Sequence, residues 1–506
     1  MFEALIIMKR KLKKRILCIV PLPPPVHGSA MMCQYIKDSH LINDTFQCDY
    51  VNLSTSRRMD EIGKRSIKKI FRFIGSYFSV LGKLFTHHYD ACYLAITCHG
   101  MGFLKDAPFV VLCKLFGRKV VIHQHNKGMA NDVDRWPYRW LLPLVYRNTT
   151  VILLSWKLYP DVKKVVKREQ VMICPNGIPD IDQIPHRQPH AIPHLLFLSN
   201  LIESKGVIDL LDACKILKDK GYRFVCNFVG GETKDINAER FNAEVKKRGL
   251  DQTVCYLGSK YGESKMKQYA DNDMLVFPTC NDCFPLVLLE AMQNKLPTVS
   301  TDVGGIPDIV SNGETGLICE KHFPNDLADK IEKLLDNPEI AIRMGEEGRK
   351  RFLENYTISK HEEVVNNALM KICISGGGGN YVNYLGKKYG DEKSEILASS
   401  DIFVFPTCYP NECFPLVLLE AMQHGLSVVT TDEGGITDVV LDGVNGLICR
   451  KHDSKDLANK IGFLLDNPQV AFDMGRKGKN LYEERFTLRT CLACITGALD
   501  KAVVSV

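Results

Sequence analysis

The sequence predicts an α/β protein built from doubly wound parallel sheets, and three observations support this. Short apolar runs alternate along the chain with longer segments of helical periodicity, which is typical of parallel sheets covered by helices. The 506 residues are 45% hydrophobic and 25% charged, a composition that excludes a largely disordered chain. The length is enough for two or three domains of about 150 residues each.

The candidate strands are spaced so that a helix fits between most neighbours. In chain order they lie at 16–20, 91–97, 120–124, 151–155, 195–199, 224–229 and 274–277. After the fourth of them, Ile-Pro occurs three times within the polar stretch 178–194, which is typical of a linker. We therefore place an N-terminal Rossmann-like domain at 1–185 and a second one at 186–371.

The rest of the chain repeats part of the second domain. The block CFPLVLLEAMQ at 283–293 returns unchanged at 413–423, and the similarity extends to residues 357 and 487. A repeat unit of this length is not a solenoid period, so it indicates a partial duplication. The copy at 372–506 is incomplete, because nothing before Tyr384 corresponds to residues 195–231.

An incomplete copy leaves a strand without its neighbour. In a doubly wound sheet the fourth strand lies beside the first, so the strand expected at 402–405 would have a free edge. The second copy could form an appendage, displace the first copy on the sheet that begins at residue 195, or stay poorly ordered. We expect an appendage, because the contiguous first copy closes with shorter loops.

The repeated block places two carboxylates around a helix N-terminus. Proline is favoured in the first turn of a helix, so Pro285, and Pro415 in the second copy, should open a helix whose free N–H groups can receive a phosphate. Glu290 then lies roughly 7 Å along the helix axis, within reach of ribose hydroxyls. Asp282 in the loop would face the sugar.

The two copies differ in the loop before this block. The first copy reads CND at 280–282, and the second reads CYPNE at 408–412. The first copy therefore lacks a Tyr-Pro pair and carries Asp282 where the second carries Glu412. Since a displacement of about 1 Å can cost about a hundredfold in rate, we expect the first copy to bind donor weakly or react slowly.

This pattern resembles the E-x7-E motif of family 4 retaining glycosyltransferases, which have the GT-B fold of two Rossmann-like domains facing across a cleft. Four further segments agree with that family in their order along the chain. They are PPPVHGSA at 23–30, IHQHN at 122–126, CPNGIP at 174–179 and LIESKG at 201–206. The resemblance covers residues 12–371 and, a second time, 384–487. It implies an acceptor-binding domain at 1–185, a donor-binding domain at 186–371 and an extra half unit at 372–506.

The resemblance also implies the residues of the site. Catalytic positions fall on His125, Asp282 and Glu412. Donor-binding positions fall on Gly28, Lys205, Phe284, Pro285, Leu286, Glu290, Gly304, Gly305 and Glu420. Lys205 and a helix N-terminus would stabilise the leaving diphosphate, so we expect neither a metal nor a cofactor. The family's arginine shortly before this lysine is missing here.

Simpler interpretations of these residues stay open. His125 could cap a strand end, and Lys205 could be a solvated loop lysine. The pair Gly304 and Gly305 could form a turn that needs positive φ. Two C-x-x-C pairs, at 280–283 and 491–494, lack the second pair or the suitably spaced histidines of a zinc site.

The charge is unevenly distributed. Residues 1–190 hold 29 Lys and Arg against 14 Asp and Glu, whereas the remainder holds 36 against 45. Within the basic half, Lys64–Phe85 alternates basic and apolar residues at helical spacing, which suits an anionic membrane surface or a helix with its apolar side in the core. No recognisable nucleic-acid motif accompanies the charge, and no apolar run reaches the roughly 18 residues of a membrane span. The 19 cysteines are scattered, which favours a reducing cytosol.

The family implies a hexosyltransferase that acts at the cytoplasmic face of a membrane in envelope polysaccharide synthesis. Its donor would be a nucleotide-sugar, and a UDP-sugar is the donor we expect. Its acceptor would be a lipid-linked or growing saccharide, and the configuration of the transferred sugar would be retained. Two alternatives remain. One is a catalytically impaired duplication product that only binds nucleotide or a partner enzyme. The other is a sugar-nucleotide epimerase, against which the loop carboxylate and the segments at 174–179 and 201–206 argue.

Overall fold

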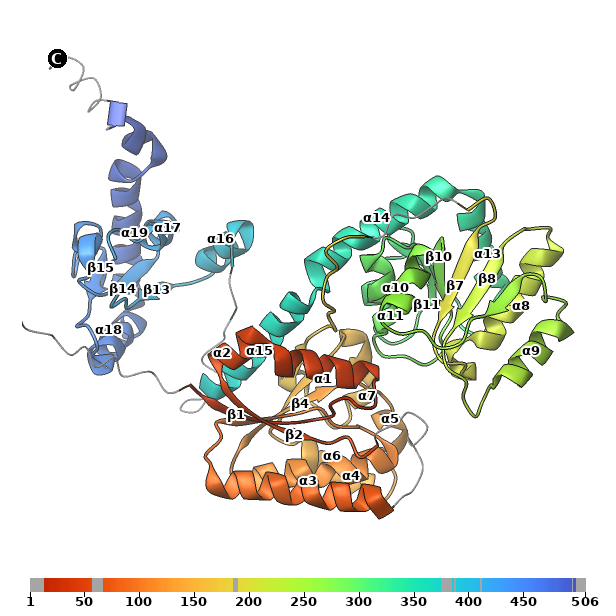
Figure 1. Cartoon of the computed structure of the whole chain (residues 1–506). Helices are drawn as coiled ribbons and strands as arrows, with labels where there is room; N and C mark the ends of the chain where they lie inside the picture. Colours follow the sequence, from red (N-terminus) through yellow and green to blue (C-terminus); the bar gives the residue numbers. More distant parts are fainter. Residues whose placement is uncertain are drawn as a thin grey trace, which may run out of the picture. The chain divides into compact units, whose positions relative to one another are not determined.

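The computed structural model describes residues 13–56, 67–184, 190–374, 385, 388–409, 412–493 and 495–496. The chain divides into two compact units, 1–384 and 385–506, and each is described by itself (Figure 1). The first unit contains two six-stranded sheets and the second a three-stranded sheet, all of parallel strands. The α/β class predicted from the sequence is confirmed.

The first sheet has the strand order β2-β1-β3-β4-β5-β6. Its strands are β1 Arg15–Val20, β2 Gln47–Asn52, β3 Ala91–Leu94, β4 Lys119–Gln124, β5 Thr150–Leu153 and β6 Val171–Ile173. The run at β1 is apolar throughout because both faces of a parallel sheet are covered by helices. Every strand that we predicted in this part of the chain is present, and the six-residue β2 and the three-residue β6 are additional.

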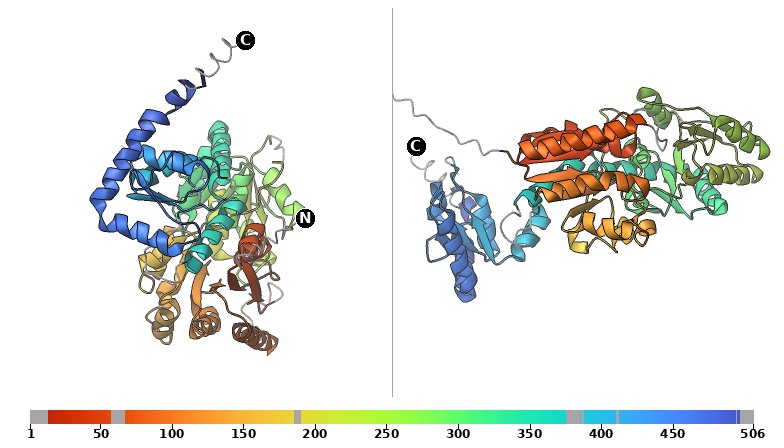
Figure 2. Two further views of the ribbon diagram at one scale, coloured as in Figure 1. Left: turned by 90° about the vertical axis from the view of Figure 1, so that its left-hand side faces the viewer. Right: turned by 90° about the horizontal axis from the view of Figure 1, so that it is seen from below.

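Helices cover both faces of this sheet. They are α1 Gly28–Asp38, α2 His40–Thr45, α3 Ile67–Thr86, α4 Gly100–Leu115, α5 Met129–Asp132, α6 Tyr138–Tyr146 and α7 Tyr159–Val162. Successive strand residues point to opposite faces. Leu17 and Ile19 therefore pack with α3, α4 and α6, whereas Ile16 and Cys18 pack with α1 and α2. In the right-hand view of Figure 2, which shows the protein from below, α3, α4 and α6 lie side by side.

The second sheet has the order β12-β11-β10-β7-β8-β9, so its fourth strand lies beside its first. Its strands are β7 His194–Leu198, β8 Val225–Val229, β9 Val254–Tyr256, β10 Met274–Phe277, β11 Thr298–Thr301 and β12 Gly316–Cys319. Its helices are α8 Val207–Asp219, α9 Ala238–Lys247, α10 Glu263–Ala270, α11 Leu286–Gln293, α12 Ile306–Ile309, α13 Pro324–Asp336 and α14 Pro338–Asn355. The first copy of the repeat supplies β10 to β12, as expected, because Met274 of β10 is in register with Leu195 of β7.

The helix α15 Ile358–Ile374 returns from the second sheet to the first (Figure 1). Its residues Val365, Ala368 and Leu369 are fully buried in the same core as Ile16 of β1. The core of the first sheet is therefore completed by residues that follow the whole second sheet in the sequence.

The second copy of the repeat forms a sheet of its own with the order β13-β14-β15. Its elements are α16 Gly390–Ala398, β13 Ile402–Phe405, α17 Leu416–Gln423, β14 Ser427–Thr430, β15 Gly446–Ile448, α18 Ser454–Asp466 and α19 Pro468–Arg485. Among the described residues β13 pairs only with β14, so it is the edge strand that the sequence predicted. Val404 of β13 is 37% exposed, whereas Val276 at the same place in β10 is buried.

Helix α3 forms from residue 67 onward in the segment 64–85, and it shows which of the apolar side chains of this segment are buried. Val80 and Leu84 are buried in the core, but a larger set of apolar residues on the same helix is exposed. These are Ile67, Ile70, Phe71, Ile74, Phe78 and Phe85. Part of the helix thus anchors it to the sheet, and the rest presents apolar side chains outward. Within the described residues, no helix is both long and apolar enough to cross a membrane.

Candidate functional site

The repeated block places the start of α11 beside the end of β10. Pro285 has an extended backbone (φ −71°, ψ 126°) and is the N-cap, so the helix begins at Leu286. Our prediction that Pro285 and Pro415 occupy the first helical position was wrong by one residue, since Pro415 is likewise an N-cap. Among the described residues no side-chain cap hydrogen bond is made at the start of α11. Its first N–H groups and the positive end of its dipole are therefore free to receive an anion.

Glu290 lies inside α11 and is held by two donors from α10. Lys265 Nζ is 2.5 Å from one carboxylate oxygen, and the hydroxyl of Tyr269 donates to the other. The Glu290 side chain is 15% exposed. Burial, and after it the charge of Glu290, raise the pKa of Tyr269 well above its usual value, so the tyrosine stays a donor. Glu290 is thus fixed in position.

The segment 201–206 brings Lys205 to the loop before α11. Its Nζ atom lies 2.5 Å from Oδ2 of Asp282. Gly206 has φ +84°, and a Cβ there would lie 2.2 Å from the carbonyl oxygen of Pro278, so only glycine fits this close approach. The backbone N–H of Cys280 donates to the carbonyl of Ser204 at 2.8 Å. The lysine segment and the loop after β10 are therefore locked together.

Gly304 and Gly305 lie against the same loop. Gly304 has φ +58°, and a Cβ there would be 2.3 Å from the carbonyl oxygen of Asp282. Gly305 donates its N–H to the carbonyl of Cys283 at 2.7 Å. Gly304 therefore makes the turn of positive φ, and the glycine pair packs closely on the Asp282 loop, while donor binding by the pair stays a prediction.

Contacts across the two sheets of the first unit bring the N-terminal residues to this loop. Asn176 donates from its side-chain amide to the carbonyl of Phe284 at 3.0 Å. A Cβ on Gly28 would lie 3.9 Å from Leu286. Phe284 is buried and packs edge-on to Tyr356. Gly28 of the segment 23–30 therefore lies near Leu286 of the repeated block, which follows Phe284 by two residues.

His125 follows β4 and belongs to a cluster of histidines. Its ring centroid is 4.1 Å from that of His123, which is in turn 5.8 Å from His361 of α15. Neither ring nitrogen of His125 has a hydrogen-bond partner among the described residues. Burial, followed by the charges of His361 and His27, lowers the pKa of His125 to about 3. His125 is therefore neutral near pH 7, with one ring nitrogen as a donor and the other as an acceptor, and both nitrogens are buried.

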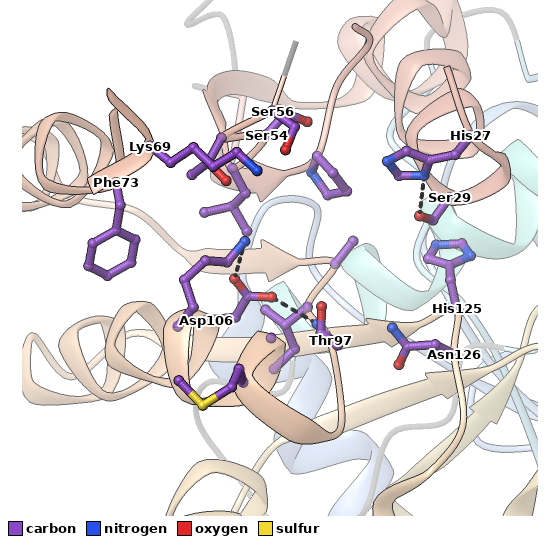
Figure 3. Close-up of a pocket in the computed structure, with 18 of the residues that line it drawn as sticks. His27, Ser29, Ser54, Ser56, Lys69, Phe73, Thr97, Asp106, His125 and Asn126 are labelled. Carbon is purple, nitrogen blue, oxygen red and sulfur yellow. Dashed lines mark hydrogen bonds and ion pairs between the residues drawn. The ribbon is translucent and has the colours of Figure 1, made fainter. Parts of the chain in front are cut away.

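A pocket of about 1060 Å³ opens beside His125 in the N-terminal part. Figure 3 shows Lys69 and Phe73 of α3 on one side of it and His27 and His125 on the other. Asp106 of α4 is buried at its wall, accepts from the N–H of Thr97 at 2.9 Å, and has a pKa raised by burial. Sequence reasoning missed Asp106, although a lone carboxylate in a mostly apolar helix was a signal that could have found it.

The second copy places Glu412 and Glu420 in the other compact unit. Glu420 keeps a lysine partner, since Lys393 Nζ lies 2.5 Å from it, but Leu397 stands where the first copy has Tyr269. In the described part of this unit no strand occupies the place of β7, and no segment corresponds to the one that carries Lys205. Residues 410–411 of the longer loop lie outside the described residues.

Comparisons with known proteins match this arrangement. A model of the family described as Glycosyl transferases group 1 matches residues 182–351 and 367–481. The capsular polysaccharide biosynthesis glycosyltransferase CapM of Staphylococcus aureus is 31% identical over 155 residues, which are 31% of this chain and 40% of CapM. D-inositol 3-phosphate glycosyltransferase of Corynebacterium glutamicum is 29% identical over 188 residues, 36% of this chain and 44% of that protein. The chain thus spans less than half the length of these relatives.

Solved structures resemble the fold more widely. Sucrose-phosphate synthase from Thermosynechococcus elongatus superposes with a TM-score of 0.59 at 17% identity, over 72% of this chain and 100% of that one. HepE from Anabaena, in complex with UDP-glucose, superposes with a TM-score of 0.54 at 15% identity, over 71% of this chain and 99% of that one. At such identities the likeness shows the fold, and it confirms the two-sheet architecture predicted for the first unit.

Proposed function

Because the chain belongs to the Glycosyl transferases group 1 family, we propose that it transfers a sugar from a nucleotide-sugar donor to a lipid-linked or saccharide acceptor. The donor is a UDP-sugar, and the configuration at the transferred carbon is retained. The observation that carries this proposal is the grouping of Lys205, Asp282, Glu290 and the uncapped start of α11 around one loop.

The described groups suit a nucleoside diphosphate in three ways. A leaving diphosphate gathers negative charge, which Lys205 and the N–H groups at the start of α11 would stabilise. Glu290, held by Lys265 and Tyr269, has its carboxylate fixed where ribose hydroxyls can donate to it. Asp282 would leave Lys205 and turn to the sugar when the phosphate arrives. HepE is named as a complex with UDP-glucose, which supports a UDP-sugar.

The pocket beside His125 is proposed as the acceptor site. It is lined by groups that can hydrogen-bond to saccharide hydroxyls, among them Ser54, Thr97 and Asn126. The neutral His125 lies at the side of this pocket and would contact the donor sugar or the attacking hydroxyl.

The exposed side of α3 supports action at a membrane surface. Phe71 and Phe78 are 69% and 64% exposed, and Lys68 lies on the same helix. Apolar side chains with interspersed lysines bind the surface of an anionic bilayer. CapM is named for capsular polysaccharide biosynthesis, which supports a saccharide acceptor in envelope polysaccharide synthesis.

A second candidate function has one observation in its favour. Asp282 forms an ion pair with Lys205, and its loop is two residues shorter than the duplicate loop. If Asp282 did not release the lysine, the protein would bind nucleotide without transferring sugar.

The test compares Glu290→Gln with Glu420→Gln in the full chain. The two glutamates have the same helix sequence and a lysine partner each, so the second variant is a matched control. We expect Glu290→Gln to weaken UDP binding, measured by calorimetry, and to slow sugar transfer from UDP-glucose or UDP-N-acetylglucosamine, while Glu420→Gln changes neither. Loss with Glu420→Gln alone would assign the site to the second copy. UDP binding without transfer to any acceptor would favour the binding-only function.

A further inference from the structure

Three side chains of metal-ligating type converge behind the lysine segment, outside the site described above. Asp209 lies in the first turn of α8, Cys280 follows β10, and His322 lies between β12 and α13. Cys280 Sγ is 3.6 Å from Asp209 Oδ2 and 3.3 Å from His322 Nδ1. His322 Nδ1 is 3.3 Å from Asp209 Oδ2. The three atoms therefore form a nearly equilateral triangle.

The triangle does not have the form of a nucleophilic cysteine relay. In such a relay the histidine contacts the thiol with one ring nitrogen and its carboxylate partner with the other. Here Nδ1 of His322 faces both Cys280 and Asp209. One nitrogen, one sulfur and one carboxylate oxygen instead face a common point.

The sides of the triangle agree with the ligand set of a tetrahedral zinc ion. Zinc binds sulfur at about 2.3 Å, imidazole nitrogen at about 2.0 Å and carboxylate oxygen at about 2.0–2.2 Å. At tetrahedral angles these bonds separate sulfur from nitrogen or oxygen by about 3.5 Å, and nitrogen from oxygen by about 3.3 Å. The observed separations of 3.3–3.6 Å leave room for such an ion with little movement.

We propose that Asp209, Cys280 and His322 bind a divalent transition-metal ion, Zn²⁺ in first place, with water as the fourth ligand. The three residues line a separate cavity of about 660 Å³, which gives the ion access from solvent and leaves space for the water. Cys280 binds as the thiolate, and its proton passes to solvent. Sulfur, imidazole and carboxylate together exclude Mg²⁺ and Ca²⁺, which require oxygen ligands.

The ion would stabilise the loop that carries Asp282. Cys280 is two residues before Asp282, and its N–H donates to the carbonyl of Ser204, the neighbour of Lys205. A bound ion would tie this loop to α8 and to the turn before α13. The residues act on structure and not on the transferred sugar. This proposal departs from the expectation of no metal, which concerned the donor diphosphate. It also differs from a C-x-x-C site, because Cys283 of that pair is buried and is not part of the group.

The duplicate provides a control within the same chain. Cys408 and His452 occupy the places of Cys280 and His322, and His452 has φ 58° where His322 has φ 57°. The duplicated segment has no counterpart of Asp209, because it begins after the sequence that corresponds to α8. The turn therefore forms without the third ligand, and changes at Cys408 or His452 should leave the metal site intact.

The test adds Co²⁺ or Zn²⁺ to the full chain after removal of metal with a chelator and of any affinity tag. Wild type should bind about one equivalent of Zn²⁺ by elemental analysis. It should also show the charge-transfer absorption of a thiolate bound to Co²⁺. Cys280→Ser should abolish that absorption, and Cys408→Ser should retain it. Changes of residues that only contact a metal ligand weaken metal binding by about tenfold or more. Because His322→Gln removes a direct ligand, it should weaken Zn²⁺ binding by at least about tenfold.

Two results would overturn the proposal: wild type without the cobalt–thiolate absorption, or the same absorption in Cys280→Ser. Since His322 is 65% exposed, His322→Gln should keep the fold and tests the site even if Cys280→Ser is unstable. Thermal unfolding without metal checks that each variant is folded.

Discussion

The ammonium of Lys205 lies 2.5 Å from a carboxylate oxygen of Asp282, and both side chains are mostly buried, at 23% and 18% exposure. The cation expected to hold the donor diphosphate is thus already paired with an anion. A phosphate can reach Lys205 fully only when Asp282 moves away.

The first prediction concerns this pair. Asp282→Asn removes the competing charge, so we expect UDP to bind several times more tightly while sugar transfer slows. Lys205→Met should weaken UDP binding by about tenfold or more, since a charge-assisted hydrogen bond contributes about 1.5–3 kcal/mol. Calorimetry with UDP and a transfer assay measure the two effects. Unchanged UDP affinity in both variants would show that the phosphate does not approach this pair.

The second prediction concerns Gly304, whose φ is +58°. Gly304→Ala would place a Cβ 2.3 Å from the carbonyl oxygen of Asp282, so the loop must shift, at a cost above about 1 kcal/mol. We expect weaker donor binding and a lower unfolding temperature of the first unit. Gly434→Ala is the matched control: φ is +53°, and the clash is with Glu412 of the second unit. It should leave donor binding unchanged; equal loss in both variants would contradict this assignment.

The third prediction concerns pH. Burial lowers the pKa of His361 to about 4, and burial with the charges of His361 and His27 lowers that of His125 to about 3. Unfolded histidine has a pKa near 6.5, so between these values the unfolded chain binds more protons. The contribution of these histidines to the free energy of unfolding should therefore reach its maximum above about pH 6.5. It should decrease as the pH falls toward 4, by up to about 1.4 kcal/mol per pH unit for each histidine.

The measurement for the histidines is urea unfolding at several pH values. His361→Phe should reduce the slope of unfolding free energy against pH between 6.5 and 4. His424→Phe, an exchange at a half-buried histidine of the second unit, is the control. A slope that stays the same in His361→Phe would show that this buried ring does not titrate as described.

The fourth prediction concerns α3. Replacing Phe71 and Phe78 together by Ser should reduce sedimentation with vesicles of phosphatidylglycerol, because both rings are exposed beside lysines. Phe472→Ser removes a ring of similar exposure, 65%, from α19 and serves as the control. Binding that persists in the double variant, or that also occurs with neutral vesicles, would rule out this surface as the anionic membrane contact.

The sequence predicted those parts of the fold in which local composition decides the structure. The runs at 16–20 and 274–277 are apolar because both faces of their strands are buried, and they are strands in the structure. The strands β2, β6, β9, β11 and β12 were not among the predicted runs. Of these, β6 and β9 have only three residues each, and segments so short carry little periodicity. The start of α11 was misplaced by one residue because Pro285 adopts an extended backbone, which its preference for the first helical turn does not reveal.

Proximity between distant segments was harder to predict. Family resemblance brought Lys205 and Asp282 into one site, and they do contact each other. The resemblance gave no reason to expect the hydrogen bond from Tyr269 to Glu290 or the stacking of His361 with His123, because α10 and α15 carry no recognisable motif. Cys280 and His322 are 42 residues apart, a separation that matches no standard zinc spacing.

The return of α15 to the first sheet also has a consequence for the order in which the chain can fold during synthesis. Domains generally fold as units, N-terminal first, while the ribosome adds about 5–20 residues per second. Here the core cluster that contains Ile16 is complete only when Leu369 of α15 joins it. The second sheet, which needs only residues up to 356, can close earlier. The N-terminal half is thus the last part of the first unit to become native, and a nascent chain arrested before residue 358 should expose to chaperones the part of its first sheet that α15 covers and that α1 and α2 leave uncovered.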